Sequence, residues 1–154
     1  MIIGVISDTH GLLRPQAMEA LQGSEHIIHA GDIGAADIIP ALREIAPVTA
    51  IRGNVDKEAW TRQYRETEVV ELAGSHLYVI HSVQALDLNP TAAGFAAVIS
   101  GHSHQPSEQM KDGVLYFNPG SAGPRRFKLP ISVGRLEIVN GKLTSQIIEL
   151  RISA

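Results

Sequence analysis

The chain opens with Ile2-Ile3-Gly4-Val5-Ile6-Ser7-Asp8-Thr9-His10-Gly11, and this stretch decides the fold. Its apolar run is short and rich in β-branched residues, which predicts a buried strand rather than a helix. Asp8 and His10 follow this strand, and residues two apart in an extended segment point to the same side. We therefore expect their side chains to meet just beyond the carboxyl end of the strand, where the ligand sites of open α/β sheets lie.

Length and composition limit what the protein can be. The 154 residues suit a single domain that spans residues 1–154, and the net charge of −3 does not favour nucleic acid as a partner. The chain has no cysteine, which excludes disulfides, thiol catalysis and thiolate zinc sites and leaves His, Asp, Glu and Asn as metal ligands. There is no signal peptide pattern and no apolar run of the roughly 20 residues that span a membrane. A cytoplasmic protein without a membrane partner is therefore expected.

Strands and helices alternate over the first third of the chain. Strands are expected near residues 2–6, 25–30 and 48–52, with helices over residues 12–23 and 37–46 between them. Pro15 suits the first turn of one helix, and Asp37 is the expected N-cap of the other. Such an alternation predicts a parallel sheet with crossover helices.

The rest of the chain predicts strands joined by short turns. Strands are expected over residues 67–73, 76–81, 96–100, 107–111, 114–117, 131–139 and 142–152. The dipeptides Asp112-Gly113 and Asn140-Gly141 are typical of hairpin turns, and Asn89 predicts the cap of one helical turn. Together with the first third, this pattern predicts an α/β fold in which two sheets form a β-sandwich flanked by helices.

Polar residues that can bind metal ions follow five of these strands, mostly beside a glycine that lets the backbone turn sharply. They are Asp8, His10, Asp32, Asn54, His81, His102 and His104. Imidazole and oxygen ligands without sulfur suit manganese, iron, zinc or nickel, and this set with one bridging carboxylate suffices for two ions. Two ions about 3.5–4 Å apart form the clamp that is used for in-line displacement at phosphorus.

The order of these motifs resembles that of the calcineurin-like metallophosphoesterase superfamily, and in particular its small single-domain bacterial and archaeal phosphodiesterases. The matching motifs are Asp8-x-His10, Gly31-Asp32, Gly53-Asn54, His81, Gly101-His102-x-His104 and the loop Asn118-Pro119-Gly120-Ser121. The resemblance implies a β-sandwich with α/β/β/α layers. It also implies two divalent metal ions as cofactors, of which manganese is expected and iron, zinc or nickel are alternatives.

The resemblance further implies a role for each ligand. One ion would be held by Asp8, His10, Asp32 and His104, and the other by Asp32, Asn54, His81 and His102, with Asp32 bridging. The nucleophile of the family is a hydroxide that bridges the ions, and the second set of ligands would position it and the substrate. Two dications, two carboxylates and one hydroxide leave a net positive charge, which attracts a phosphodiester monoanion. We therefore predict the hydrolysis of a small phosphodiester.

Two departures from the family pattern concern the leaving group. Larger members of the superfamily carry a histidine directly after the asparagine, where this chain has Val55. Many members also read His-Gly-His where this chain has His81-Ser82-Val83. Both changes keep the metal ligands, but they leave the leaving group without an assigned proton donor. We therefore expect a preference for leaving groups of low pKa, as in aryl phosphodiesters.

Other functions and contacts stay open at this level. A phosphomonoesterase or a nucleotide pyrophosphatase could use the same metals, and a non-catalytic protein-binding scaffold could use the same fold, although the intact ligand set favours an enzyme. Substrate contacts are predicted for Asn54, Asn118 and Arg125, while Arg125 and Arg126 could equally form a solvated pair. Exposed strand edges and the region of Trp60 leave room for a homodimer or a higher homo-oligomer.

Several residues outside the motifs have two interpretations. His29 is expected to be an ordinary strand histidine, with a supporting hydrogen bond to a metal ligand as the alternative. Asp56 either orients His10 or a water, or it stabilises a turn. Trp60 and Tyr64 are expected to pack against the core or a second subunit rather than to stack on a nucleobase.

Overall fold

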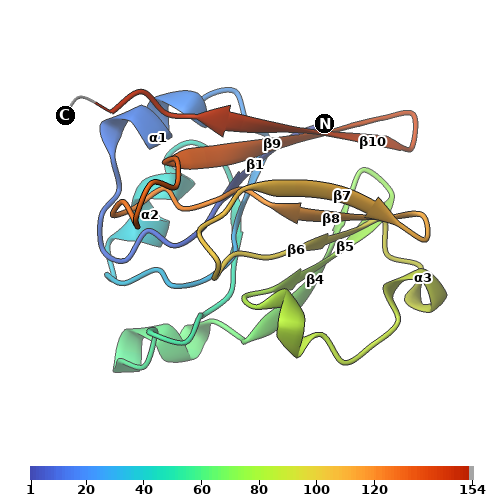
Figure 1. Cartoon of the computed structure of the whole chain (residues 1–154), viewed down its shortest axis with the longest axis horizontal. Helices are drawn as coiled ribbons and strands as arrows, with labels where there is room; N and C mark the ends of the chain where they lie inside the picture. The colour runs from blue at the N-terminus through green and yellow to red at the C-terminus, as the bar shows by residue number, and fades with distance from the viewer. Residues whose placement is uncertain (153–154) are drawn as a thin grey trace.

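Two five-stranded sheets pack face to face in the computed structural model, which describes residues 1–152 (Figure 1). The first sheet contains, in spatial order, β10 (Lys142–Glu149), β9 (Ser132–Val139), β1 (Ile2–Ile6), β2 (His26–His29) and β3 (Val48–Ala50). The second sheet contains β4 (Thr67–Leu72), β5 (Ser75–Ile80), β6 (Ala97–Ile99), β8 (Val114–Asn118) and β7 (Ser107–Lys111). The predicted α/β fold with two packed sheets is therefore confirmed.

Parallel pairing brings several strand ends to a common side of each sheet. β1 pairs in parallel with β2, and β2 with β3, so that Ile6 lies opposite His29 and His29 opposite Ala50. In the second sheet β5, β6 and β8 are parallel in the same way, with Val79 opposite Ile99. Loops that follow parallel neighbours leave the sheet at the same edge, which is where the predicted ligands lie.

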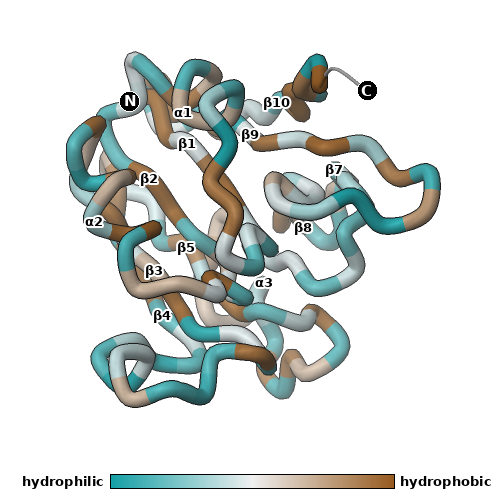
Figure 2. The backbone as a smooth tube through the Cα atoms, turned by 90° about the vertical axis from the view of Figure 1, so that its left-hand side faces the viewer, coloured by the Kyte–Doolittle hydropathy of each residue, from teal (hydrophilic) through white to brown (hydrophobic). Residues whose placement is uncertain are grey.

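The core between the sheets explains why β1 is apolar on both faces. Ile3 and Val5 pack between the sheets with Val79 and Phe117, whereas Ile6 packs beneath the helices on the other side of the first sheet. A strand that is buried on both faces needs the continuous apolar run that the sequence contains. Figure 2 shows the same distribution, with hydrophobic stretches on the strands and mostly hydrophilic connecting loops.

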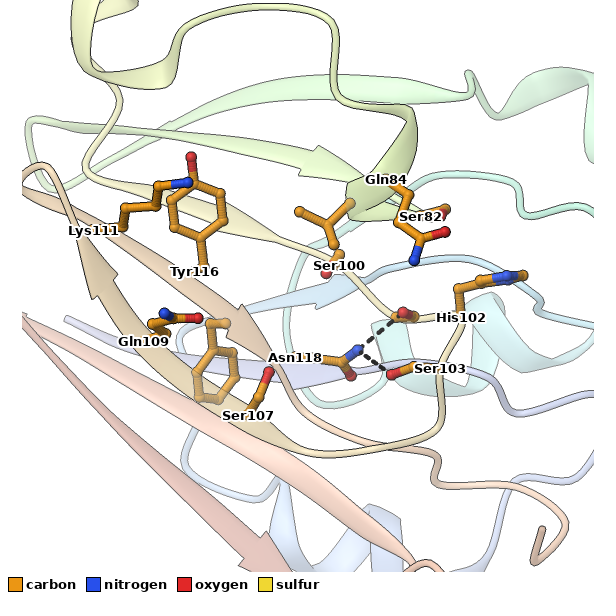
Figure 3. A pocket seen from close by; sticks show the side chains of 13 residues that line it. Ser82, Gln84, Ser100, His102, Ser103, Ser107, Gln109, Lys111, Tyr116 and Asn118 are labelled. Carbon is orange, nitrogen blue, oxygen red and sulfur yellow. Dashed lines mark hydrogen bonds between the residues drawn. The ribbon is translucent and has the colours of Figure 1, made fainter.

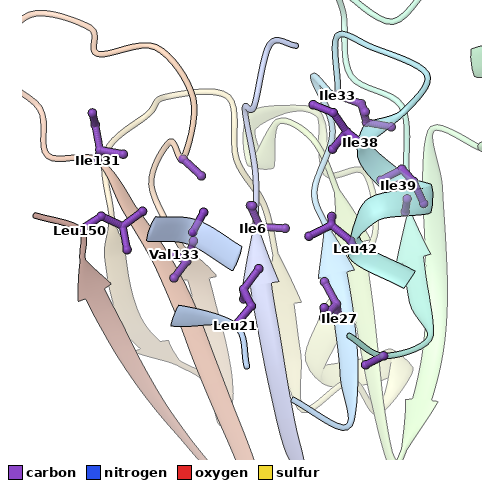
Figure 4. Close-up of a cluster of buried hydrophobic side chains, with 14 of the residues drawn as sticks. Ile6, Leu21, Ile27, Ile33, Ile38, Ile39, Leu42, Ile131, Val133 and Leu150 are labelled. Carbon is purple, nitrogen blue, oxygen red and sulfur yellow. The ribbon is translucent and has the colours of Figure 1, made fainter. Parts of the chain in front are cut away.

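Two short helices cover the outer face of the first sheet (Figure 4). They are α1 (Pro15–Ala20) and α2 (Ile38–Arg43). Leu42 of α2 and Leu21, just after α1, belong to the same buried apolar cluster as Ile6 of the sheet. This layer and the second sheet together seal β1 and β2 from water.

The helices differ in detail from the sequence-based expectation. α1 and α2 are shorter than predicted, because the chain on either side of them forms turns that continue into the loops. Asp37 lies at the N-cap of α2, as predicted, although its side chain makes no capping hydrogen bond. Asn89 does cap α3 (Pro90–Ala93), since its Oδ1 accepts a hydrogen bond from the Ala92 N–H at 3.2 Å.

The polar stretch after β3 forms a short 3₁₀ helix, η1 (Ala59–Gln63). Tyr64 is buried and Trp60 is partly buried against the core of the first sheet, which confirms packing as their role. A second 3₁₀ helix, η2 (Val83–Ala85), begins a segment that covers part of the outer face of the second sheet, where Leu86 packs. Among the helices of residues 1–152, none has the length and apolar character needed to cross a membrane.

Candidate metal centre

The predicted ligands lie on loops that follow β1, β2, β3, β5 and β6, and two groups of these side chains converge. Asp8, His10 and His104 form one group, and Asp8, Asp32 and His81 form the other; within each group the ligand atoms lie within 4.8 Å of one another. Both sheets contribute, since the two aspartates follow strands of the first sheet and His81 and His104 follow strands of the second. The packing of the two sheets therefore assembles the site.

Asp8 Oδ1 lies at the centre of both groups. It is 3.7 Å from His10 Nε2, 3.8 Å from His81 Nε2 and 3.5 Å from His104 Nε2. Asp32 Oδ2 lies 3.5 Å from His10 Nε2 and 3.2 Å from His81 Nε2. The resemblance implied that Asp32 alone bridges, whereas in the structure both carboxylates face histidines of both groups.

Several polar atoms of this site are buried without a hydrogen-bond partner among the described residues. They are Asp8 Oδ1, His10 Nε2, His81 Nε2 and His104 Nδ1. A buried polar group without a partner destabilises a folded protein, and a charged one does so strongly. Carboxylate oxygens and imidazole nitrogens are ligands that divalent transition metals prefer. The residues present therefore fit the metal ions that the sequence predicted.

Asn54 and His102 lie beside the two groups and are exposed. The centroid of the His102 ring lies 5.2 Å from that of the His81 ring, and the two rings are inclined at 79°. All three residues line a cavity of about 620 Å³. Neither Asn54 nor His102 belongs to the two converging groups, so metal ligation by these residues stays a prediction.

The backbone of the ligand loops is strained. Five of the predicted ligands have a φ angle in the left-handed region, which residues other than glycine rarely adopt. They are Asp8 at 56°, His10 at 45°, Asp32 at 57°, His102 at 73° and His104 at 63°. Such conformations cost free energy and cluster at functional sites, where the surrounding structure fixes them.

Two glycines let the loops approach Asp8 closely. A Cβ atom at Gly101 would lie 2.6 Å from Asp8 Oδ2, and one at Gly123 would lie 2.6 Å from the Asp8 carbonyl oxygen. The space that Gly101 leaves is used for hydrogen bonding, because Asp8 Oδ2 accepts from the Ser7 hydroxyl at 2.8 Å and from the His102 N–H at 3.0 Å. One oxygen of Asp8 is therefore fully engaged by the protein, and the other is left for a ligand.

Electrostatic interactions in the metal-free site favour charged side chains. Burial acts to raise the pKa of Asp8, but the neighbouring His10 and His81 outweigh it, and the pKa lies below its ordinary value. The contact with Asp8 raises the pKa of His10, and the contact with Asp32 raises that of His81 against the effect of burial. Protons on these imidazoles supply the positive charge that a metal ion would otherwise supply. Metal binding must displace them, and the metal affinity is therefore expected to rise with pH.

His29 is fully buried at the end of β2 and connects two ligand loops. Its Nδ1 accepts a hydrogen bond from the Gly31 N–H at 3.1 Å, and its Nε2 lies 3.0 Å from Thr9 Oγ1. Thr9 donates its hydroxyl proton to the Ile33 carbonyl at 2.7 Å, so His29 Nε2 carries a proton and donates it to Thr9. His29 is thus more than the ordinary strand histidine that was expected, because it supports the residues next to Asp8 and Asp32.

Asp56 ties the loop after β2 to the loop after β3. Its carboxylate accepts hydrogen bonds from the N–H groups of Ile33 and Gly34, each at 3.0 Å, and from that of Gly53 at 2.8 Å. This confirms the interpretation that Asp56 stabilises a turn. Because Asp32 directly precedes these donors, the same hydrogen bonds fix its position.

Asn118 at the end of β8 uses its side chain within the protein. Its Nδ2 donates to the Gly101 carbonyl at 2.9 Å and lies 3.2 Å from Ser103 Oγ, and its Oδ1 accepts from the Gly120 N–H at 2.9 Å. Asn118 therefore positions the loop that carries His102 (Figure 3). The direct substrate contact that the sequence predicted for Asn118 stays a prediction.

The loop that follows Asn118 runs along the ligand loop of Asp8. Ser121 Oγ donates a hydrogen bond to the Asp8 carbonyl at 3.0 Å, and Arg14 donates to the Gly123 carbonyl at 3.2 Å. These supports were not predicted from the sequence, in which the only signal for Ser121 is the family motif that contains it.

Arg125 and Arg126, at the end of this loop, differ in how their charges relate to the metal site. Burial lowers the pKa of His104, and the positive charge of Arg126 lowers it further and also opposes the rise in the pKa of His10. Arg125 instead donates a hydrogen bond to the Leu129 carbonyl at 3.4 Å. Arg126 is therefore the arginine whose charge reaches the metal site, and Arg125, for which substrate contact was predicted, folds back on its own loop.

The fold and the buried carboxylates and imidazoles define an α/β sandwich with a candidate centre for divalent metal ions. The chain belongs to the calcineurin-like phosphoesterase superfamily, because the sequence model of that superfamily's domain matches residues 1–141. The resemblance drawn from the motifs is thereby confirmed.

Individual relatives agree with this membership. The chain is 36% identical over 159 residues to a protein of Methanothermobacter thermautotrophicus that is named a probable metallophosphoesterase, and the match covers 96% of this chain and 92% of that protein. It is 28% identical over 139 residues to a phosphodiesterase of Methanocaldococcus jannaschii, with 78% and 83% covered. The structure of Vps29 from Chaetomium thermophilum superposes with a TM-score of 0.80 at 17% identity, over 94% of this chain and 85% of that one, which shows a common fold.

The burial of His29 predicts a specific dependence of stability on pH. Burial lowers the pKa of its imidazole to about 4, so the folded metal-free protein keeps it neutral where the unfolded chain, with a pKa of about 6.5, takes up a proton. The free energy of unfolding is therefore expected to fall by up to about 3 kcal/mol as the pH falls from 6.5 towards 4, because the unfolded chain gains a proton on His29 that the folded protein does not. The raised pKa values of His10 and His81 act in the opposite direction, but only near and above pH 6.5, because well below that pH both groups are protonated in both states.

Urea unfolding of the chelator-treated protein between pH 7 and pH 4 measures this effect. His29→Gln is expected to be less stable at pH 7 but to lose less of its stability on acidification than the wild type. An NMR titration of the folded wild type provides an independent measurement, and a His29 imidazole that titrates near pH 6.5 would contradict the prediction.

Proposed function

We propose that this protein is a dinuclear metal-dependent phosphodiesterase, with manganese as the expected ion. The observation that supports this most directly is the convergence of ligand atoms from Asp8, His10, Asp32, His81 and His104, several of which are buried without a hydrogen-bond partner among the described residues. Two divalent ions bound there would supply Lewis-acid charge and activate a water molecule at neutral pH. The carboxylates of Asp8 and Asp32 are suited to hold the ions close together, since each faces histidines of both groups.

The remaining side chains of the site are arranged to bind and orient a substrate. Asp8 and His81 are buried and close the inner side of the centre, whereas Asn54 and His102 are exposed and border the cavity on its open side. A phosphate group that enters from the open side meets Asn54 and His102 first, and these residues can donate hydrogen bonds to its oxygens. Arg126 lies where its charge can reach the same phosphate.

The shape of the surface supports a diester rather than a monoester as the substrate. One cavity of about 620 Å³ and another of about 360 Å³ flank the centre, and Ser82 and His102 line both. A phosphorus atom at their junction can place one organic group in each cavity, whereas a monoester has only one organic group to place. The likeness to a relative named as a phosphodiesterase supports the same choice.

Two measurements test this proposal: the metal content of the protein, and the activity of a variant that lacks the Asp32 carboxylate. Protein that has been treated with a chelator and reloaded with manganese is expected to bind two ions per chain and to hydrolyse bis(p-nitrophenyl) phosphate only when loaded. Asp32→Asn is expected to lower kcat/KM more than about 100-fold, because even the loss of an outer partner of a ligand costs 10–100-fold. Asp37→Asn is the matched control, since Asp37 is exposed and makes no capping bond. Near-native activity of the Asp32 variant would argue against a shared ligand.

The two arginines give a second comparison. Arg126→Ala is expected to raise KM for an aryl phosphodiester about tenfold, because a charge-assisted hydrogen bond to phosphate is lost. Arg125→Ala removes the same charge from the neighbouring position and is expected to leave KM within about twofold of the wild type. Steady-state kinetics with manganese-loaded proteins would measure both values. A larger effect from Arg125 would reverse the assignment.

The leaving-group preference expected from Val55 can be tested directly. Val55 is 48% exposed beside Asp32, whose Oδ1 accepts the Val55 N–H at 3.1 Å. The rate of the wild type is expected to fall steeply as the pKa of the leaving group rises. Val55→His introduces a proton donor at this position and is expected to flatten the dependence, since general acid catalysis contributes about 10²-fold or more for poor leaving groups. Val55→Asn is the control without a titrating group, and a wild-type rate that is independent of leaving-group pKa would refute the expectation.

A further inference from the structure

A cavity of about 360 Å³ lies on the outer face of the second sheet, beside the metal centre (Figure 3). Residues 83–95 cover the neighbouring part of this face, where Leu86 and Phe95 pack with Tyr78 and Val98. β7 stays exposed next to this segment, and we name the cavity between the segment and the strands β8 and β7 the outer groove. Its polar walls include Gln84, Ser103, Ser107, Gln109, Lys111 and Tyr116.

The outer groove begins at the metal centre and runs along β7. His102 lines both this groove and the larger cavity on its other side. Side chains two apart on a strand share a face, so Ser107, Gln109 and Lys111 form one row that is about 13 Å long. Tyr116 of β8 pairs with Gln109 across the sheet. Figure 3 shows Lys111 and Tyr116 at the end of the groove that is remote from His102.

The outer groove offers neutral hydrogen-bonding groups and one aromatic face. Most of its polar side chains are hydroxyls and amides, no Asp or Glu of residues 1–152 lines it, and Lys111 is the one lysine at its wall. Tyr116 packs on one side against the apolar cluster that contains Val98, and it is only partly buried and also lines the cavity. Hydroxyls and amides suit the hydroxyl groups of a sugar and the edge of a nucleobase, and an aromatic ring suits the face of a base.

We propose that the outer groove binds the nucleoside of a nucleoside 5′-phosphodiester, an inference that rests on the proposed phosphodiesterase function. With the phosphorus at the metal centre, the sugar lies along Ser107 and Gln109, and the base stacks on Tyr116 near Lys111. A plain aryl group would form no hydrogen bonds with the amides and hydroxyls of the groove, and a polyol would not stack on the tyrosine ring. The second ester group of the substrate then occupies the cavity on the other side of His102.

Two diesters with the same leaving group isolate the contribution of the groove. They are p-nitrophenyl thymidine 5′-phosphate and methyl p-nitrophenyl phosphate, assayed with the manganese-loaded full chain. Tyr116→Ala is expected to raise KM about tenfold for the nucleoside ester, because the stacking partner of the base is lost. Gln109→Ala and Lys111→Met are expected to raise it several-fold each. The kcat values and the kinetics of the methyl ester should stay unchanged.

Matched variants control for effects on folding. Tyr116→Phe keeps the ring and should keep the wild-type KM, and thermal unfolding checks that Tyr116→Ala remains folded. Met110→Ala changes an exposed residue on the same strand that does not line the groove, and it should leave both substrates unaffected. Equal changes for both esters, or an unchanged KM for the nucleoside ester in the groove variants, would overturn the proposal.

A binding measurement separates failure of this proposal from failure of the proposed function. If the loaded wild type hydrolyses neither ester, the phosphodiesterase function is wrong, and calorimetry with thymidine 5′-monophosphate still tests the groove. An affinity that falls about tenfold in Tyr116→Ala and is kept in Tyr116→Phe would support nucleoside binding. No binding to the wild type, or equal affinity in both variants, would overturn it.

Discussion

The rest of this structure depends on the burial of one carboxylate, that of Asp8, which has hydrogen-bond partners for only one of its two oxygens. Asp8 is fully buried; its Oδ2 accepts two hydrogen bonds from the protein, whereas its Oδ1 makes no hydrogen bond within the described residues and faces three imidazoles. A buried charge without compensation destabilises a fold strongly, and a bound cation turns the same charge into a ligand. In the metal-free protein, protonated His10 and His81 can supply part of this compensation. The site is therefore built to exchange protons for metal ions, and its stability is coupled to both.

The two-sheet architecture is what holds this carboxylate among its partners. Asp8 follows β1 of the first sheet and His104 follows β6 of the second, so the distance between them depends on how the sheets pack. The apolar core between the sheets, with Val5 and Phe117, fixes that distance. Its burial offsets the free-energy cost of the left-handed turns at the ligands. Polar supports such as Asp56 then join neighbouring loops, so that the ligands are held by backbone hydrogen bonds rather than by their own side chains alone.

The strands and the ligand positions could be predicted from the sequence because both are local signals. Each predicted ligand follows a short apolar run, and each of these runs forms a strand in the structure. The supports could not be predicted in the same way. Ser121 meets Asp8, and Asn118 meets Gly101, only because the sheets bring distant loops together, and no spacing in the sequence encodes that contact. The supporting role of His29 was predicted only as an alternative for a related reason, since its contact with Thr9 follows from the pairing of β1 with β2.

The same arrangement separates the chemistry of the site from the recognition of a substrate. The ligand loops are locked by close glycine contacts and by hydrogen bonds, so most changes there would disturb the metal centre. β7, in contrast, is exposed along its whole length, and its residues can change at little cost to the fold. In this chain the edge of the second sheet can therefore change without disturbing the candidate metal centre. It follows that the ligand motifs are informative about the reaction, whereas the substrate must be inferred from side chains such as Gln109 and Tyr116 that no motif contains.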